Sequence, residues 1–236
     1  MATESKFKAV VALSGGLDSG VLLSRILAGG FYAPDEVACI NYQYRSKHNK
    51  RELASGARIA QHYKVLYYHF NTQSLIDPYG SSALVCTDVE IPEGHYEEES
   101  MRQTVVPGRN LVFAAALASF AESFGASEIF IGAHAGDHFI YPDCRPEFLS
   151  SLKQTIYLST DKKVSLVVPF TNFNKSEIVR MGLADKFPFE KSWTCYKGGM
   201  IACGVCGSCQ ERLEAFHLNE TEDPLPYETR VLLPKK

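Results

Sequence analysis

Short runs of β-branched and other apolar residues alternate with amphipathic segments along most of the chain. The apolar runs predict strands at residues 8–13, 36–42, 64–70, 127–134 and 163–170. The amphipathic segments predict helices at residues 20–30, 51–63, 110–125, 146–158 and 174–183. Strands and helices in alternation build a parallel sheet covered by helices. The pattern therefore predicts an α/β protein with a Rossmann-like, doubly wound parallel sheet.

Residues 71–106 interrupt this alternation with turn-forming and acidic sequence. A long irregular segment in a compact domain is typical of a lid or an interface, and equally of a solvated surface loop. Both interpretations stay open at the level of the sequence.

Composition and charge narrow the class of protein. A chain of 236 residues, 45% hydrophobic and 22% charged, can bury one sizeable core, and we expect a main domain at residues 1–185 and a small subdomain at residues 186–236. The formal charge of -3 argues against strong electrostatic binding of nucleic acid, so small molecules are the expected substrates. Neither a leader peptide nor an apolar run of about eighteen residues occurs, which predicts a soluble, cytoplasmic protein without a membrane partner.

The segment between the first predicted strand and the first predicted helix suits an anion. It consists of Ser14, Gly15, Gly16, Leu17, Asp18 and Ser19. Backbone N–H groups and the positive end of the helix dipole converge at such a junction, and the two glycines let the main chain approach a pyrophosphate. A carboxylate beside phosphates is repelled unless it holds a cation or caps the helix, so Asp18 implies Mg²⁺.

This loop lacks the Lys of a Walker A motif, and Leu17 occupies the position of the second glycine in GxGxxG. It resembles the SGGxDS loop of the PP-loop ATP pyrophosphatases. In that superfamily the loop binds the pyrophosphate of ATP while a substrate oxygen attacks the α-phosphate, which leaves an adenylated intermediate.

Four of the seven cysteines lie close together near the C-terminus, at positions Cys195, Cys203, Cys206 and Cys209. The spacing C-x7-C-x2-C-x2-C suits metal ligation better than a disulfide framework, and four thiolates suit tetrahedral Zn²⁺ in a closed site. An iron–sulfur cluster and redox or sulfur-carrier chemistry are the alternatives that ligand type leaves open.

Polar residues gather where predicted strands end, which is where open α/β sheets bind ligands. After the second strand they are Tyr42, Tyr44, Arg45, Lys47 and His48. After the fourth strand they are His134, Asp137, His138, Asp143, Cys144 and Arg145. Arg109 and Asn110 precede a long apolar helix, so Asn110 is a candidate cap and Arg109 a candidate ligand of phosphate or carboxylate. Solvated loops and simple capping are the competing interpretations of these groups.

Taken together, SGGLDS at 14–19, PGRN at 107–110, YPDCRPEF at 141–148 and CGVCGSC at 203–209 resemble the 7-cyano-7-deazaguanine synthase family of the queuosine pathway. The resemblance implies a PP-loop fold of the adenine nucleotide α-hydrolase type with a zinc-binding C-terminal subdomain. It also implies that ATP adenylates 7-carboxy-7-deazaguanine, that ammonia converts the adenylate through an amide to the nitrile, and that Mg²⁺, Zn²⁺ and a homodimer take part.

The resemblance assigns roles to individual residues. The expected catalytic residues are Ser14, Asp18, Ser19, Lys47 and Asp137. The expected nucleotide-binding residues are Leu13, Ser14, Gly15, Gly16, Leu17, Asp18, Ser19, Arg109, Asn110 and Gly132. The expected substrate-binding residues are Tyr42, Arg45, His48, Arg109, Asp137, Tyr141, Asp143, Cys144 and Arg145.

Two departures from the family pattern bear on the second substrate. The family usually has YGQRH after its second strand, where this chain has YQYRSKH at 42–48, and a Ser-Gly pair where this chain has Phe139 and Ile140. They motivate an alternative in which the acyl group is transferred to a protein amine, as in paralogues of bacterial antiviral operons. A tRNA-modifying PP-loop enzyme and a non-catalytic nucleotide-binding protein are the remaining alternatives.

Overall fold

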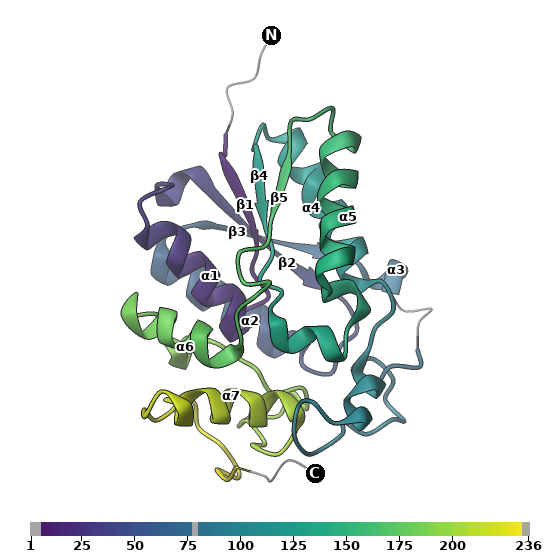
Figure 1. Ribbon diagram of the computed structural model, residues 1–236, viewed down its shortest axis with the longest axis vertical. Helices are drawn as coiled ribbons and strands as arrows, with labels where there is room; N and C mark the ends of the chain where they lie inside the picture. Colours follow the sequence, from purple (N-terminus) through teal and green to yellow (C-terminus); the bar gives the residue numbers. More distant parts are fainter. Residues whose placement is uncertain (1–5, 77–79, 233–236) are drawn as a thin grey trace.

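The computed structural model describes residues 6–76 and 80–232. Five parallel strands form one sheet in the order β3-β2-β1-β4-β5 (Figure 1). These strands are β1 (Ala9–Ala12), β2 (Val37–Gln43), β3 (Leu66–Asn71), β4 (Glu128–Phe130) and β5 (Ser165–Val167). The chain builds outward from β1 to β3 and then returns to the other side of β1, so the predicted doubly wound sheet is confirmed.

Helices cover both faces of this sheet, with α1, α2 and α6 on one face and α4 and α5 on the other (Figure 1). The helices are α1 (Leu17–Ala28), α2 (Asn49–Tyr63), α3 (Gln73–Ile76), α4 (Arg109–Ser123), α5 (Pro146–Ser159), α6 (Lys175–Ala184) and α7 (Gly207–Leu218). Short 3-10 helices span Pro34–Glu36, Glu99–Thr104, Ala135–Phe139, Pro142–Cys144 and Phe189–Lys191.

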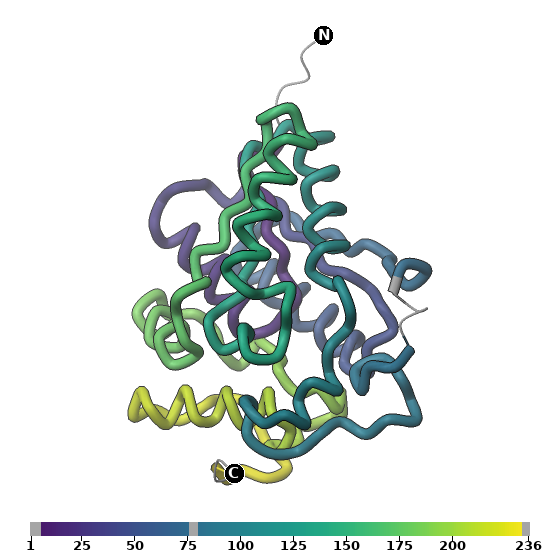
Figure 2. Tube along the Cα trace, turned by 45° about the vertical axis from the view of Figure 1, so that its right-hand side comes forward, coloured from purple at the N-terminus to yellow at the C-terminus, as the bar shows by residue number. Residues whose placement is uncertain are grey.

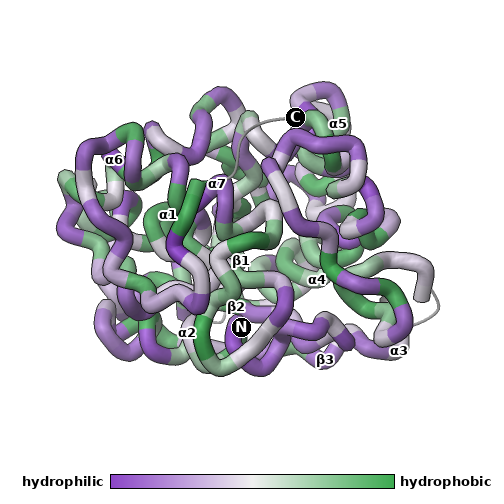
Figure 3. The backbone as a smooth tube through the Cα atoms, turned by 90° about the horizontal axis from the view of Figure 1, so that it is seen from below, coloured by the Kyte–Doolittle hydropathy of each residue, from purple (hydrophilic) through white to green (hydrophobic). Residues whose placement is uncertain are grey.

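Covering both faces of the sheet explains why the strands appear in the sequence as continuous apolar runs. Successive side chains of a strand point to opposite faces, and here both faces are buried under helices. In β1, Val11 packs into the core beneath α1, whereas Val10 packs beneath α4. β1 lies inside the molecule, while β3 at the edge of the sheet is largely hydrophilic and partly exposed (Figure 3). The strong hydrophobic signal therefore belongs to the central strands.

The segment after β3 packs against the C-terminal part of the chain (Figure 2). Ala83, Leu84 and Ile91 share an apolar cluster with Trp193 and the cysteines, and the Gly94 N–H donates to the Val205 carbonyl at 3.0 Å. The structure describes residues 71–76 and 80–106 of the irregular segment. Their packing supports the interpretation of this segment as an interface, here with the C-terminal part of the same chain.

Several boundaries differ from the predictions. β4 and β5 are shorter than predicted, because their last predicted residues form loops at the carboxyl edge of the sheet. Asn174 caps α6 and accepts from the Glu177 N–H at 3.0 Å. Helix α7 was not predicted. Within the part of the chain described, no helix is both long enough and apolar enough to cross a membrane.

A buried ion pair holds the C-terminal tail on α7. Arg212 donates to both carboxylate oxygens of Asp223, from Nε at 2.7 Å and from Nη2 at 2.9 Å, and neither side chain is exposed. The same guanidinium donates to the Ser192 hydroxyl at 2.8 Å. The pair thus joins three segments that follow the sheet.

We expect Asp223→Asn to lower the free energy of unfolding by about 3–5 kcal/mol, because it leaves the Arg212 charge buried without its counter-ion. Urea unfolding measures this change. Glu222→Gln is the matched control, since the Glu222 side chain is 83% exposed, and its effect should stay within about 0.5 kcal/mol. Equal stability of the two variants would contradict the expectation.

Candidate functional site

A cavity opens at the carboxyl ends of the strands, where β1 and β4 lie side by side and their connections leave in opposite directions. This is the switch point at which open α/β sheets bind ligands. Its walls come from the loop after β1, the end of β2, the start of α4, the segment after β4 and the C-terminal part of the chain.

Residues 14–19 are the phosphate loop, and all of them except Gly15 line the cavity. The hydroxyls of Ser14 and Ser19 are 3.0 Å apart, and the Gly16 N–H donates to Ser14 Oγ at 3.1 Å. Gly16 precedes α1 without a capping side-chain hydrogen bond, which leaves N–H groups at the helix start for an anion. Gly15 has φ of +90°, and a Cβ there would lie 2.3 Å from the Glu52 carbonyl oxygen. The loop therefore tolerates no side chain at Gly15.

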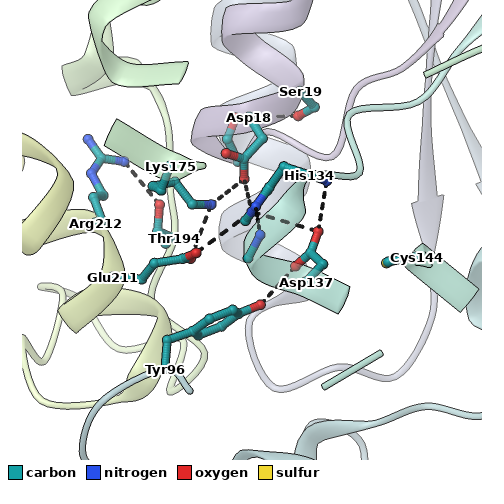
Figure 4. Close-up of polar contacts among 12 residues, drawn as sticks. Asp18, Ser19, Tyr96, His134, Asp137, Cys144, Lys175, Thr194, Glu211 and Arg212 are labelled. Atoms are coloured by element: carbon teal, nitrogen blue, oxygen red, sulfur yellow. Dashed lines mark hydrogen bonds and ion pairs between the residues drawn. The ribbon is translucent and has the colours of Figure 1, made fainter. Parts of the chain in front are cut away.

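Charged side chains from four elements meet beside this loop (Figure 4). Lys175 Nζ lies 2.6 Å from Asp18 Oδ2 and 3.2 Å from Glu211 Oε2. His134 Nε2 lies 3.9 Å from Asp18 Oδ2 and Glu211 Oε1 and 3.7 Å from Asp137 Oδ2. The Gly136 N–H donates to His134 Nδ1 at 3.0 Å, so in the neutral ring the proton is on Nε2 and faces the carboxylates.

The pKa values in this cluster are set by two opposing effects, burial and the charges of neighbouring side chains. Burial alone would raise the pKa of Asp18, but Lys175 and His134 lower it below its ordinary value. Burial would lower the pKa of Lys175, but Asp18 and Glu211 raise it. Burial raises the pKa of Glu211, with Lys175 and His134 opposing. Asp18 and Lys175 are consequently both charged at neutral pH.

This donor set fits a hard divalent cation. Three carboxyl groups, of Asp18, Asp137 and Glu211, surround one ammonium group, so the cluster carries excess negative charge when all are ionised. Asp18 Oδ1 is buried without a hydrogen-bond partner among the residues described. Carboxylate oxygens are the ligands that Mg²⁺ takes in proteins, usually together with substrate phosphates.

The opposite end of the cavity is aromatic and positively charged. Tyr42 stacks on Phe113 with ring centroids 3.9 Å apart. Arg109 Nη1 lies 3.4 Å from the Tyr44 hydroxyl, and the guanidinium carbon lies 5.7 Å from the centre of the Tyr141 ring. Among the described residues, no carboxylate forms an ion pair with Arg109 within 4 Å. A planar anion with an aromatic ring would satisfy this end.

Two titratable groups beside Arg109 have pKa values shifted toward the uncharged form. Burial raises the pKa of Glu52 to about 8, with Arg109 opposing the rise. Burial and the Arg109 charge lower the pKa of His48 to about 3. Burial would lower the pKa of Arg109, but the hydroxyls of Tyr44 and Tyr141 raise it, so the guanidinium stays charged.

The structure brings most of the predicted site residues to this cavity. Those that line it are Ser14, Gly16, Leu17, Asp18, Ser19, Tyr42, His48, Arg109, Asn110, Gly132, Asp137, Tyr141 and Cys144. The remaining predicted residues, which are not among those lining it, are Leu13, Gly15, Arg45, Lys47, Asp143 and Arg145.

The residues that do not line the cavity have other contacts. Lys47 Nζ donates to the Val89 carbonyl, and Arg145 Nε donates to the His138 carbonyl at 3.1 Å. Asp143 accepts from the Asn110 N–H at 2.8 Å and so holds the start of α4.

The prediction that Asn110 caps α4 is wrong. The cap position is Gly108, and the Asn110 amide donates to the Asp143 carbonyl at 3.3 Å and to Cys144 Sγ at 3.0 Å. Asn110 is therefore within the first turn of the helix and joins it to the segment after β4.

Sequence reasoning missed Lys175, Glu211, Glu52 and Tyr96. Lys175 directly follows a helix cap and Glu52 lies in an amphipathic helix, so both resemble ordinary surface positions in the sequence. Tyr96 comes from the irregular segment, and its hydroxyl donates to Asp137 Oδ1 at 2.9 Å. Glu211 could have been found from its position two residues after Cys209, because a residue so close to a predicted metal ligand is held in place by the same site.

The four predicted cysteine ligands converge in a buried cluster, with sulfur atoms all within 4.8 Å of one another. A tetrahedral site with Zn–S bonds of about 2.3 Å has sulfurs about 3.8 Å apart, and Cys203 Sγ lies 4.0 Å from Cys209 Sγ. The N–H groups of Cys203 and Cys206 donate to cluster sulfurs at 3.4 Å. The geometry fits a metal site and does not distinguish zinc from an iron–sulfur cluster.

The sheet order and the loop at its switch point define the class: a Rossmann-like α/β protein of the PP-loop type. Among solved structures, the U34-tRNA thiolase NcsA of Methanococcus maripaludis with its 4Fe-4S cluster aligns at a TM-score of 0.50. The alignment covers 92% of this chain and 66% of that chain at 13% identity, which is a likeness of fold alone.

The sequence model described as "Queuosine biosynthesis protein QueC" matches residues 8–220. The 7-cyano-7-deazaguanine synthases of Methanoregula boonei and Pseudoalteromonas atlantica are 42% and 41% identical over 221 residues, which cover 94% of this chain and 99% of each relative. The synthase of Caldicellulosiruptor bescii is 41% identical over 224 residues, covering 95% of this chain and 99% of the relative. The chain belongs to the QueC family, and the resemblance drawn from its motifs is confirmed.

We expect Cys206→Ser to release most of the metal and to lower the melting temperature, because a closed four-thiolate site loses one ligand. Elemental analysis of anaerobically purified protein measures metal per chain, and iron with acid-labile sulfide in place of zinc would identify the cluster alternative. Cys86→Ser, outside the cluster, is the control and should keep the metal. Unchanged metal content in Cys206→Ser would refute this assignment.

Proposed function

We propose that this chain uses ATP to adenylate 7-carboxy-7-deazaguanine and joins the activated carbon to ammonia, giving 7-cyano-7-deazaguanine. The observation that carries the proposal is that the phosphate loop and the partly buried Arg109 line the same cavity. The names of relatives that align over nearly their whole length supply the product, 7-cyano-7-deazaguanine.

ATP is bound with its phosphates on the phosphate loop. The N–H groups at the start of α1 and the hydroxyls of Ser14 and Ser19 donate to phosphate oxygens, and Lys175 adds a charge that its carboxylate partners hold in place. Asp18, with Asp137 and Glu211 nearby, would hold Mg²⁺, which supplies neutralisation of the developing pyrophosphate charge.

The deazaguanine acid is bound at the aromatic end. The stacked pair Tyr42 and Phe113 offers an apolar surface to a flat heterocycle, and Arg109 pairs the carboxylate. A carboxylate oxygen attacks the α-phosphorus, pyrophosphate leaves, and the acyl adenylate remains between the two ends of the cavity.

Ammonia then attacks the acyl carbon and AMP leaves, which gives the amide. A second ATP activates the amide oxygen in the same way, and loss of AMP and a proton gives the nitrile. Both activation steps require the acyl group of the substrate to lie next to the phosphate loop. One cavity can therefore serve both steps.

Ammonia is the proposed nucleophile, and not a protein amine, because the relatives are named for the cyano product. The departures that motivated the alternative are residues 42–48, Phe139 and Ile140. Tyr42, Tyr44 and His48 line the cavity, whereas Lys47, Phe139 and Ile140 do not. Ile140 is buried in the core, whereas the Phe139 side chain is 46% exposed and lies beside Arg102.

With ATP, Mg²⁺, ammonia and the deazaguanine acid, we expect AMP, pyrophosphate and the nitrile, detected by mass spectrometry. Asp18→Asn should reduce turnover about 100-fold or more, because it removes charge that holds Lys175 and Mg²⁺. Asp161→Asn is the control, because Asp161 lies in the turn after α5 and does not line the cavity. Formation of ADP, or an amide-linked protein in place of the nitrile, would reject the proposal.

Arg109→Lys should raise the KM for the acid about 10- to 100-fold and leave the KM for ATP nearly unchanged, because an ammonium cannot reproduce the planar two-point contact. Steady-state kinetics with each substrate varied measures the split. Arg102→Lys, which does not line the cavity, should behave as the parent protein does. Equal weakening of both substrates would place Arg109 at the nucleotide instead.

A further inference from the structure

Glu52 is a carboxyl group of the cavity that the adenylation step does not use. It lies in the first turn of α2 and lines the cavity, and 16% of its side chain is exposed. Its backbone carbonyl abuts Gly15, so the residue is directly beside the phosphate loop. A group placed there flanks the position at which the acyl phosphate would lie.

The other carboxyl groups that line the cavity are already engaged. Asp18 and Glu211 bond to Lys175, and Asp137 accepts from the Tyr96 hydroxyl and the His134 N–H. Among residues 6–76 and 80–232, Glu52 has no such partner: its close contact is His48, whose Nε2 lies 3.5 Å from Glu52 Oε2. Glu52 is therefore the carboxyl group whose proton can be exchanged without breaking an ion pair.

We propose that Glu52 is the general base of the C–N bond-forming step, with His48 as a positioning residue. The inference rests on the proposed function. The ammonia nitrogen forms a bond to the acyl carbon with its lone pair, and one N–H proton passes to the Glu52 carboxylate. The bond from the acyl carbon to the AMP oxygen breaks, and its electrons leave with AMP. The products are the amide, AMP and protonated Glu52, which returns its proton to solvent.

The surroundings of Glu52 suit this role. The titratable or charged groups that face it are His48, Tyr44 at the end of β2, Tyr67 of β3 and Arg109 of α4. Burial raises the pKa of Glu52 to about 8, and Arg109 limits the rise. A general base is most effective when its pKa lies near the working pH, because it is then both available and basic enough.

Two partial reactions separate this role from adenylation. Exchange of labelled pyrophosphate into ATP, which requires the acid, reports adenylate formation without ammonia. Single-turnover formation of the amide reports the C–N step. In Glu52→Gln, an isosteric variant, we expect exchange within about twofold of the parent protein and amide formation slower by about 100-fold. Glu147→Gln, an exposed position of α5, is the matched control and should change neither.

A different nucleophile tests proton removal directly. Hydroxylamine is less basic than ammonia, and its addition product loses a proton to water more readily. The defect of Glu52→Gln should therefore shrink at least tenfold with hydroxylamine, an effect that a merely structural role would not produce. An equal defect with both nucleophiles, or a parallel loss of exchange, would overturn the proposal.

The parent protein gives an independent readout if the variant fails to fold. The carboxylate form of Glu52 increases as pH rises through about 8, so amide formation should rise between about pH 7 and 9 while exchange stays flat. Free ammonia is held constant at each pH by adjusting total ammonium. A flat profile for amide formation would overturn the role of Glu52. Absence of acid-dependent exchange in the parent protein would instead reject the proposed function.

Discussion

The steric constraint at Gly15 fixes the site, because three parts of the chain meet there. A Cβ at this position would lie 2.3 Å from the Glu52 carbonyl oxygen and 2.6 Å from the Gly56 nitrogen, both in α2. The Gly15 carbonyl accepts from the Trp193 N–H at 2.9 Å, which brings the C-terminal part to the same point. The end of β1, the start of α2 and the cysteine-bearing segment thus share one fixed contact, and the distances across the cavity follow from it.

The two ends of the cavity show how one residue type acquires different properties from its surroundings. Asp18 is partly buried beside Lys175, and its pKa falls although burial alone would raise it. Glu52 is also partly buried but has no ammonium group in contact within the described part of the chain, and its pKa rises to about 8. The first carboxyl group is thereby suited to hold a cation near phosphates, and the second to exchange a proton. Arg109 contributes to both properties of the cavity. Its charge attracts an anion, and it also limits the rise in the pKa of Glu52.

The sequence predicted the features that depend on contiguous residues. Sheet class, phosphate loop and cysteine cluster each have a local pattern, and the structure bears out the fold and the convergence of the cysteines. The charged cluster could not be predicted, because Lys175 and Glu211 approach Asp18 only after α6 and α7 fold over α1. Helix α7 escaped prediction for a related reason. Gln210, Glu211 and Arg212 are all buried, so the helix lacks the alternation of apolar and polar faces that identifies a surface helix.

The cysteine cluster also belongs to the wall of the cavity, not only to a remote subdomain. Thr194 and Tyr196 flank Cys195, and Glu211 follows Cys209 within one turn of α7, and all three line the cavity. The segment that carries Tyr96 is held to the same region by the contact of Gly94 with Val205. Short chain segments join these side chains to the sulfurs, so the cysteine cluster anchors the backbone that carries Glu211 and Tyr196. A metal bound by the four sulfurs would thereby hold part of the cavity wall in place.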